Sequence, residues 1–172
     1  MGTLRGWLLD TNVVSELRKP RPDLRVRGFV AAQPAHLLFL STITLAEVRY
    51  GVERLADAAR RRDITLWLER TLRPLFAGRT LEVSEDVVLR WRQMLEAGRR
   101  RGHTSGQPDL FVAAIAALEA LVVVSRDTHE FVAAGVPVLD PWTGTYTPAG
   151  GDPIALGELA RADLLDTIST RP

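Results

Sequence analysis

Short runs of consecutive apolar residues alternate along the chain with longer segments in which apolar residues recur every three or four positions. The runs at 7–9, 37–40, 80–83, 121–124 and 136–139 have the length of buried strands, and the segments between them have the period of amphipathic helices. Strands that alternate with helices predict a parallel sheet. Since the runs lack in–out alternation, both faces should be covered. We therefore predict an α/β sandwich with a parallel sheet of about five strands and helices on both faces.

Two of the predicted helices have distinctive patterns. Apolar residues at helical spacing predict one long helix over 57–76, and an alanine-rich apolar segment predicts another over 109–120, with Asp109 at its start. The stretch 102–108 between the later elements is rich in turn-forming residues and predicts a loop.

The composition changes after residue 142. Residues 143–153 are rich in Thr, Gly and Pro and predict a linker, and residues 155–168 have an apolar stripe typical of an amphipathic helix. We therefore divide the chain into a main domain, 1–142, and a C-terminal linker and helix, 143–172.

The composition excludes several classes of protein. The 172 residues, of which 46% are hydrophobic and 25% charged, suit one folded domain and not a disordered chain. The absence of cysteine excludes disulfides, thiolate zinc sites, iron–sulfur clusters and a cysteine nucleophile. No secretion signal of the usual form and no apolar run near the length of a membrane span is visible. We expect a cytoplasmic protein.

Basic charge is carried almost entirely by arginine, because Lys19 is the only lysine among 22 basic residues. The runs Arg60–Arg62 and Arg99–Arg101 could follow a nucleic-acid backbone, since guanidinium groups donate in pairs to phosphate oxygens. Solvated helix faces would carry the same runs. Both interpretations stay open from composition alone.

Four acidic residues lie where the carboxyl ends of the predicted strands converge. Asp10 follows the first strand, Glu47 lies on the helix after the second, Asp109 opens the helix before the fourth, and Asp127 follows the fourth. Functional groups of parallel sheets gather at this edge. Taken singly, each acid could be a helix cap or a solvated residue, but their shared position on apolar elements favours a common site.

A common site of four carboxylates requires cations. Two carboxylates 4 Å apart repel each other by about 4 kcal/mol at an effective dielectric constant near 20. With carboxylate ligands, no cysteine, and the scattered histidines interpreted as structural or exposed, Mg²⁺ or Mn²⁺ fits better than zinc. Such an ion activates water and stabilises a phosphoryl transition state, which indicates phosphodiester cleavage.

The segments around these acids resemble a known family. LLDTNVVSEL at 8–17, TITLAEVRYGV at 42–52, DLFVAAIA at 109–116 and VSRDTHEF at 124–131 resemble, in order, the four motifs of PIN-domain ribonucleases. The nearest branch is that of the VapC- and FitB-like toxins of type II toxin–antitoxin systems. VPVLDPW at 136–142 resembles the closing strand of the family.

The resemblance implies a three-layer sandwich and a metal-dependent endoribonuclease that cuts tRNA or rRNA. It also implies a homodimer silenced by a cognate antitoxin encoded beside it. By motif match, the metal-binding and catalytic carboxylates are Asp10, Glu47, Asp109 and Asp127, with Thr11 or Asn12 supporting Asp10. Two features depart from the family: Gln107-Pro108 is more polar and stiffer than usual, and the tail after Trp142 is unusually long.

Other functions are less compatible with the sequence. There is no Gly-rich phosphate cradle of the dinucleotide-binding or P-loop type. A phosphatase of the aspartyl-phosphate class would need a second acid where Asn12 stands. A catalytically inactive RNA- or protein-binding module is the main alternative, but all four acids are present. His36, His103 and His129 are scattered and are interpreted as structural or exposed.

Large apolar residues on the long predicted helix indicate that it binds a protein partner. Ile64, Trp67, Leu68 and Leu72 exceed what one small sheet is expected to cover. We therefore expect part of this helix to be buried by a second copy of the chain or by an antitoxin segment.

Overall fold

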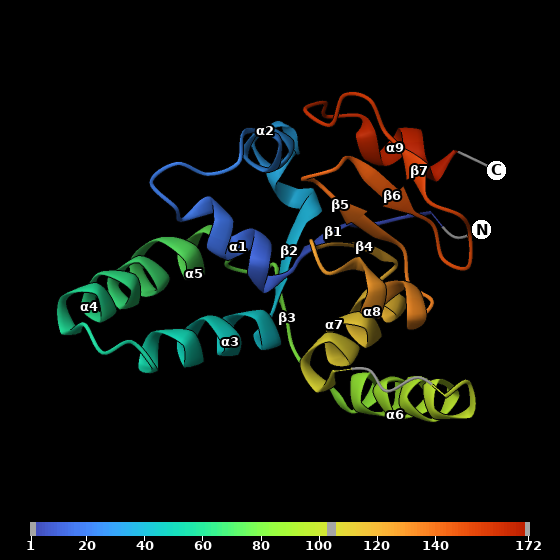
Figure 1. Cartoon of the computed structure of the whole chain (residues 1–172), viewed down its shortest axis with the longest axis horizontal. Helices are drawn as coiled ribbons and strands as arrows, with labels where there is room; N and C mark the ends of the chain where they lie inside the picture. The colour runs from blue at the N-terminus through green and yellow to red at the C-terminus, as the bar shows by residue number, and fades with distance from the viewer. Residues whose placement is uncertain (1–2, 103–105, 171–172) are drawn as a thin grey trace.

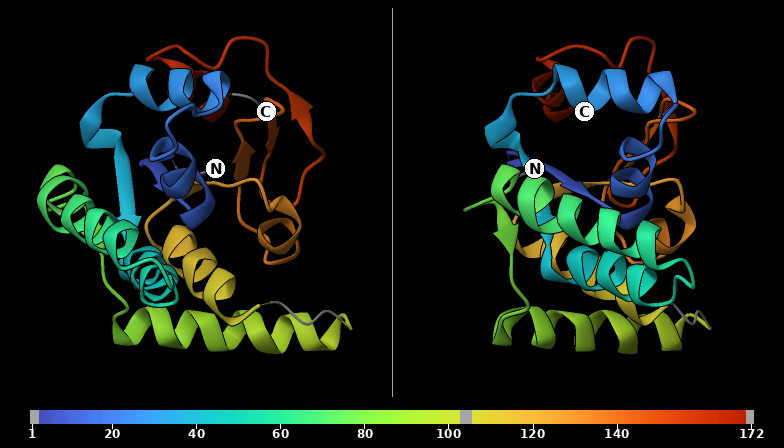
Figure 2. Two further views of the ribbon diagram at one scale, coloured as in Figure 1. Left: turned by 60° about the vertical axis from the view of Figure 1, so that its left-hand side comes forward. Right: turned by 90° about the vertical axis from the view of Figure 1, so that its left-hand side faces the viewer.

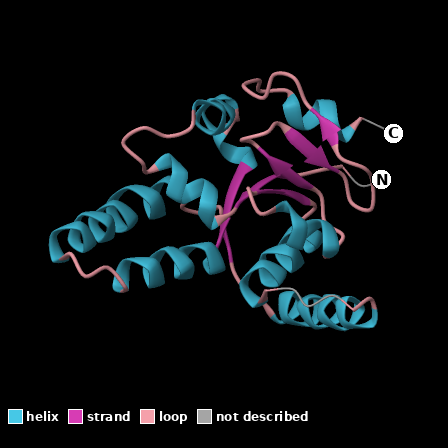
Figure 3. Ribbon diagram, viewed as in Figure 1, coloured by secondary structure: helices cyan, strands magenta, loops and turns pink. Residues whose placement is uncertain are grey.

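The computed structural model describes residues 3–102 and 106–170 and shows a central sheet between two layers of helices (Figures 1 and 3). The strands are β1 (Gly6–Leu9), β2 (Leu38–Ser41), β3 (Thr80–Leu81), β4 (Leu121–Val124), β5 (Val138–Asp140), β6 (Thr145–Thr147) and β7 (Ile154–Ala155). The helices are α1 (Thr11–Leu17), α2 (Leu24–Ala32), η1 (Ala35–Leu37), α3 (Thr42–Glu53), α4 (Ala58–Trp67), η2 (Leu68–Leu72), α5 (Arg73–Leu75), α6 (Glu85–Arg100), α7 (Gln107–Leu118), α8 (Thr128–Ala133) and α9 (Leu164–Ser169).

The strand order is β3-β2-β1-β4-β5-β6-β7. The first five strands in this order pair in parallel, whereas β6 and β7 add to the sheet antiparallel. Four residues of β1 lie in register with β4, from Gly6 beside Leu121 to Leu9 beside Val124. The predicted parallel sheet of about five strands is confirmed, and two further strands extend it.

Alternate strand residues enter two separate cores. Trp7, Leu9, Val122 and Val124 face the helices α1 and α2 and the C-terminal segment. Their neighbours in sequence, such as Leu8, face α6, α7 and α8. Figure 2 shows α2 and the C-terminal segment on one side of the sheet and α6 and α7 on the other. Both faces of the sheet are buried, as the continuous apolar runs predict.

The long helix predicted over 57–76 forms as one nearly continuous rod. Asp57 caps α4 by accepting hydrogen bonds from the backbone N–H groups of Ala59 and Arg60, at 2.9 and 3.1 Å. The π-helical turn η2 then connects α4 to α5. The helix that Asp109 was predicted to open begins two residues earlier, at Gln107. Proline is favoured in a first helical turn because it has no N–H to leave unpaired, and Pro108 occupies that turn.

The C-terminal segment differs from the prediction. The stretch 143–153 is not a linker, because it contains β6, and the predicted helix over 155–168 is reduced to α9, Leu164–Ser169. Leu156 and Leu159 fit a helical stripe, but the backbone N–H of Leu156 donates to the carbonyl of Gly144 at 2.7 Å instead. Without β6, β5 would be an edge strand with unpaired backbone N–H and C=O groups. Pairing with β6 provides hydrogen-bond partners for these groups.

The segment is part of the main core. Leu156, Leu159 and Leu164 are buried in one cluster with Trp7 and Phe29. Gln33 links the two parts of the chain. Its Oε1 accepts from the indole N–H of Trp7 at 3.0 Å, and its Nε2 donates to the carbonyl of Arg161 at 3.0 Å. The division at residue 142 therefore does not separate two independent units.

Three of the four large apolar residues that were expected to need a partner are buried within the chain itself. Ile64, Leu68 and Leu72 are 7%, 2% and 5% exposed, so for these three the expectation of cover by a second copy or an antitoxin segment is wrong, whereas Trp67 is only partly buried. The large apolar side chains that remain exposed near this rod are Tyr50, Leu66 and Leu75.

One histidine and part of a predicted loop lie outside the described residues. They are His103 and positions 103–105 of the loop predicted over 102–108. His129 has an exposed side chain, as expected. Within the described ranges, no helix has the length and apolar character needed to cross a membrane.

Candidate active site

The four predicted acids come from four elements that meet at the carboxyl edge of the sheet (Figure 1). Asp10 lies between β1 and α1, and Asp127 follows β4 and precedes α8. Glu47 is in α3, and Asp109 is in the first turn of α7. Because β1 and β4 are neighbours in register, the loops carrying Asp10 and Asp127 leave the sheet side by side.

Asp10 is the most buried of the four, with 5% of its surface exposed. Its Oδ1 accepts from the backbone N–H of Thr11 at 2.8 Å. Its Oδ2 accepts from the hydroxyl of Ser125 at 2.7 Å and from the amide of Asn12 at 3.1 Å. Three donors therefore hold this carboxylate in one orientation, as expected for a group that must be preorganised.

Ser125 and Asn12 connect Asp10 to Asp127. The Ser125 hydroxyl, fully buried, accepts from the backbone N–H of Asp127 at 3.0 Å and from the Asn12 amide at 2.9 Å. The same amide lies 3.4 Å from Oδ2 of Asp127, and the Asn12 carbonyl accepts from the backbone N–H of Arg126 at 3.3 Å. One polar network thus positions the loop after β4 against the end of β1.

Glu47 is attached to the same network through Thr11, whose hydroxyl donates to Glu47 Oε2. Ser41 caps α3 by accepting from the backbone N–H of Thr44 at 3.0 Å, which fixes the start of the helix that carries Glu47. Of the two supporting residues predicted from sequence, Thr11 therefore orients Glu47 as well as Asp10, and Asn12 contacts two of the acids.

Electrostatic coupling among the acids shows that they share one neighbourhood. The pKa of Asp109 is raised to about 6, first by burial and then by the negative charges of Asp10, Glu47, Glu130 and Asp127, in that order of size. Burial likewise raises the pKa of Asp10, as do the charges of Glu47 and Asp127, against the lowering effect of its hydrogen bonds. The folded chain therefore holds several carboxylates at a cost that a cation would relieve.

The donor set fits a hard divalent cation, since every candidate ligand is a carboxylate or hydroxyl oxygen. As the side chains are placed, no three Asp, Glu or His residues in the described part of the chain already form a group that could hold a metal ion. The acids are gathered and oriented, but they do not form a closed cage.

Sequence reasoning missed two residues of this site. Ser125 is the centre of the network, and its position directly after β4 was the available signal. Glu130 lies three residues after Asp127 in α8, one helical turn away, and its charge acts on Asp109. Both lie within the fourth motif, but a serine and a second acid have no distinctive pattern there.

A groove of about 390 Å³ adjoins the acids on the side of α1, α3 and α4. Thr11 and Glu47 form one end of it. Its walls combine apolar side chains with three cations, and they include Val48, Val52, Leu55, Ile64, Trp67, Arg18, Lys19 and Arg60. Lys19 is paired with the buried Glu16. The groove therefore has both apolar and basic surface beside an acidic centre.

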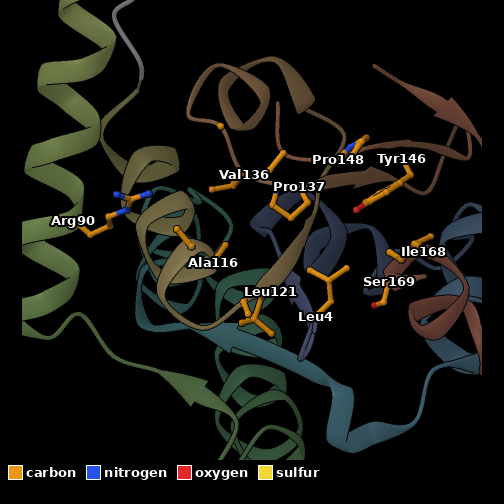
Figure 4. A pocket seen from close by; sticks show the side chains of 14 residues that line it. Leu4, Arg90, Ala116, Leu121, Val136, Pro137, Tyr146, Pro148, Ile168 and Ser169 are labelled. Carbon is orange, nitrogen blue, oxygen red and sulfur yellow. The ribbon is translucent and has the colours of Figure 1, made fainter. Parts of the chain in front are cut away.

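A different cavity lies at the opposite, amino edge of the sheet (Figure 4). It measures about 360 Å³ and is lined mainly by apolar residues of the main domain and the C-terminal segment, among them Leu4, Leu121, Pro137 and Ile168. No acidic residue lines it. This cavity therefore lacks the carboxylate ligands of the predicted site.

Comparison with known proteins identifies the family. A family model described as PIN domain matches residues 7–136. This chain belongs to the PIN domain family. Relatives include the VapC ribonuclease Y4jK of Sinorhizobium fredii (36% identical, covering 78% of this chain and 96% of the relative) and the toxin FitB of Neisseria gonorrhoeae (38% identical, covering 78% and 97%). The predicted resemblance to PIN-domain, VapC- and FitB-like proteins is confirmed.

Solved PIN-domain structures have the same fold. FitAcB from Neisseria gonorrhoeae is 38% identical, with a TM-score of 0.76 over 79% of this chain and 98% of that chain. VapBC-5 from Mycobacterium tuberculosis, a member of the VapBC family of toxin–antitoxin systems, is 26% identical, with a TM-score of 0.54 over 75% of this chain and 90% of that chain. The family model ends at residue 136, so β5, β6, β7 and α9 lie beyond it.

Proposed function

We propose that this PIN-domain protein is an endoribonuclease that depends on Mg²⁺ or Mn²⁺, and that it is the toxin of a toxin–antitoxin pair. The observation that carries the proposal is the gathering of Asp10, Glu47, Asp109 and Asp127 at one sheet edge, where burial and the neighbouring carboxylates raise the pKa of Asp10 and of Asp109. The names of the ribonuclease and toxin relatives support it.

The four carboxylates would hold the metal. When bound, a divalent cation supplies a nucleophilic water at neutral pH and stabilises the charge of a phosphoryl transition state. The chain's own contribution is orientation. Ser125 and Asn12 hold the Asp10 carboxylate, and Thr11 holds that of Glu47, so that the carboxylate oxygens are aimed before substrate arrives.

The arginines around the acidic site indicate the kind of substrate that it could bind. Arg126 follows Ser125 directly, is exposed, and its guanidinium lies 5.5 Å from the ring centroid of Trp142. On the groove side, the arginines Arg18 and Arg60 line a concave surface that also includes Glu47. These arginines fit the backbone of an RNA that crosses the acidic site, since arginine pairs with phosphate oxygens. tRNA and rRNA are the substrates implied by the family.

The direct test is RNA cleavage by the purified protein with Mg²⁺, with Mn²⁺ and with EDTA. We expect cleavage that requires the metal and is lost in Asp10→Asn, because the amide keeps the shape but removes the charge. Asp63→Asn, on the exposed face of α4, is the matched control and should cleave normally. RNA binding without cleavage would instead support a catalytically inactive binding module.

The groove beside Glu47 is the surface that we assign to the antitoxin. Its apolar walls suit an amphipathic segment, and an arginine of that segment would neutralise the acidic centre. We also expect a homodimer, for which Leu66 and Leu75 supply exposed apolar surface on the α4–α5 rod. Light scattering at micromolar concentration measures the second expectation, and a strictly monomeric protein would contradict it.

A further inference from the structure

A second concave surface opens beside the acids, on the side away from the antitoxin groove. This cleft of about 560 Å³ lies between α8 and the strand β6, and residues 151–153 close one end. Thr128, which directly follows Asp127, forms part of its wall. The family model ends before β6 begins, so this wall comes from the chain's own C-terminal segment.

The strand register places the cleft close to the site. Val124 and Leu139 pair across β4 and β5, so Ser125 and Asp140 follow them side by side. Asp140 pairs in turn with Thr145 across β5 and β6. Adjacent strands are about 4.8 Å apart, so the backbone of Thr145 is about 10 Å from that of Ser125, whose hydroxyl holds Asp10. One or two nucleotides of a single strand cover that distance.

Hydroxyl groups dominate the sheet side of the cleft. Thr143, Thr145 and Thr147 all line it, whereas Tyr146, between the last two, points into the opposite core. The hydroxyl of Thr143 donates to Oδ2 of Asp140 at 2.8 Å and lies 3.0 Å from that of Thr145. Asp140, 8% exposed, also accepts backbone N–H groups and so keeps Thr143 in place. Each hydroxyl is both a donor and an acceptor.

The opposite wall is different in character. His129 has 82% of its side chain exposed, and Val132 is 44% exposed, so a ring and an apolar surface face the threonines. The charged groups in the wall are the carboxylates Asp140 and Asp152, which repel phosphate. The cleft therefore suits an uncharged polar group with a flat face, and it does not suit a phosphate.

We propose that this cleft binds the ribose and base of an RNA nucleotide next to the cleaved phosphate, with the threonine hydroxyls contacting the 2′-OH and the base edge. This inference rests on the proposed ribonuclease function. A 2′-OH donates and accepts, as threonine does, and an imidazole supports a base by stacking. The backbone phosphates lie outside the cleft, toward Arg126. The C-terminal segment is then a specificity element of the nuclease.

The test measures RNA binding without cleavage. In the Asp10→Asn background, a fluorescently labelled short single-stranded RNA and the DNA of the same sequence are titrated by anisotropy. We expect RNA to bind more tightly than DNA, and Thr145→Val to raise the RNA Kd about five-fold, the equivalent of one hydrogen bond, with little change for DNA. His129→Ala should weaken both. Thr167→Val removes a hydroxyl from α9, outside the cleft, and should change nothing.

The possible outcomes distinguish a failure of the proposed cleft from a failure of the proposed nuclease function. If the wild-type protein cleaves RNA, Thr145→Val should raise KM and leave kcat unchanged, because Thr145 does not touch the acids. Unchanged RNA and DNA affinities in both Thr145→Val and His129→Ala, with normal circular dichroism, would overturn the cleft while leaving the nuclease intact. Weakened RNA binding in these variants, with no cleavage by the wild-type protein, would support the cleft and overturn the nuclease.

Discussion

Replacement of Ser125 by alanine tests whether the hydrogen-bond network orients the Asp10 carboxylate and stabilises its ionised form. The serine hydroxyl donates to the Asp10 carboxylate at 2.7 Å inside a fully buried environment. A hydrogen bond to a charged group contributes about 1.5–3 kcal/mol. Ser125→Ala should therefore destabilise the ionised form of Asp10 by about that amount and raise its pKa further. The Asn12 amide remains as a partial substitute, which favours the lower end of that range.

Two measurements detect this change. Loss of an outer-shell partner typically weakens metal binding about 10–100-fold, so the Kd for Mn²⁺ measured by calorimetry should rise by that factor. The acidic limb of the pH–rate profile for RNA cleavage should move to higher pH. Ser169→Ala is the matched control, since its hydroxyl donates only to the carbonyl of Leu165, in α9. Equal Mn²⁺ affinity and an equal pH profile in Ser125→Ala and wild type would refute this role for the network.

Three further predictions concern the groove, the pH dependence and the C-terminal segment. Gly51→Arg should abolish antitoxin binding in a pull-down and leave the melting temperature unchanged, because the glycine lines the groove and a Cβ there meets nothing within 4 Å. Without metal, the free energy of unfolding should fall by on the order of 1 kcal/mol as pH rises through about 6. The folded state holds the proton of Asp109 more tightly than the unfolded state because the pKa of this carboxyl is raised, and the partial exposure of the side chain reduces the effect. Urea unfolding of Asp109→Asn should lack that step, and an identical slope would contradict the assignment. Gln33→Met should cost about 2–3 kcal/mol in urea unfolding, since it leaves the buried indole N–H of Trp7 unpaired, and less in a Trp7→Phe background. Equal costs in the two backgrounds would remove that explanation.

The positions of the acids followed from the sequence because their causes are local. An apolar run of four residues predicts a buried strand, and the residue after it lies at the carboxyl edge. Asp10 directly follows β1, and Asp127 lies in the loop that follows β4, three residues after its last residue. Asp109 could be placed at a helix start from the change of pattern around residue 109, although the helix begins at Gln107. The oxygen-only donor set was equally visible, since it is a matter of composition.

The C-terminal segment could not be determined in this way. Leu156, Leu159 and Leu164 have helical spacing, but Leu156 and Leu159 cover the core from a non-helical segment and only Leu164 lies in a helix, α9. Strand pairing decides the path of the backbone: the free edge of β5 binds β6, β6 pairs with β7, and the N–H of Leu156 donates to the carbonyl of Gly144. These partners are distant in sequence, so spacing alone favoured one helix over 155–168, where the chain forms the end of β7, an irregular stretch and the short helix α9.

Only the tertiary structure determined the contacts among the site residues and the exposure of the apolar side chains. Ser125 acquires its role because β4 lies in register with β1 and brings its hydroxyl against Asp10. The pKa of Asp109 is raised because the side chain is partly buried and lies near other carboxylates. Neither cause can be recognised from the local sequence. Ile64 and Leu68 are likewise buried by packing within the chain and not by a second copy. The sequence by itself determined which groups reach the edge of the sheet, and the long-range pairing of strands and helices determined their contacts, charges and exposure.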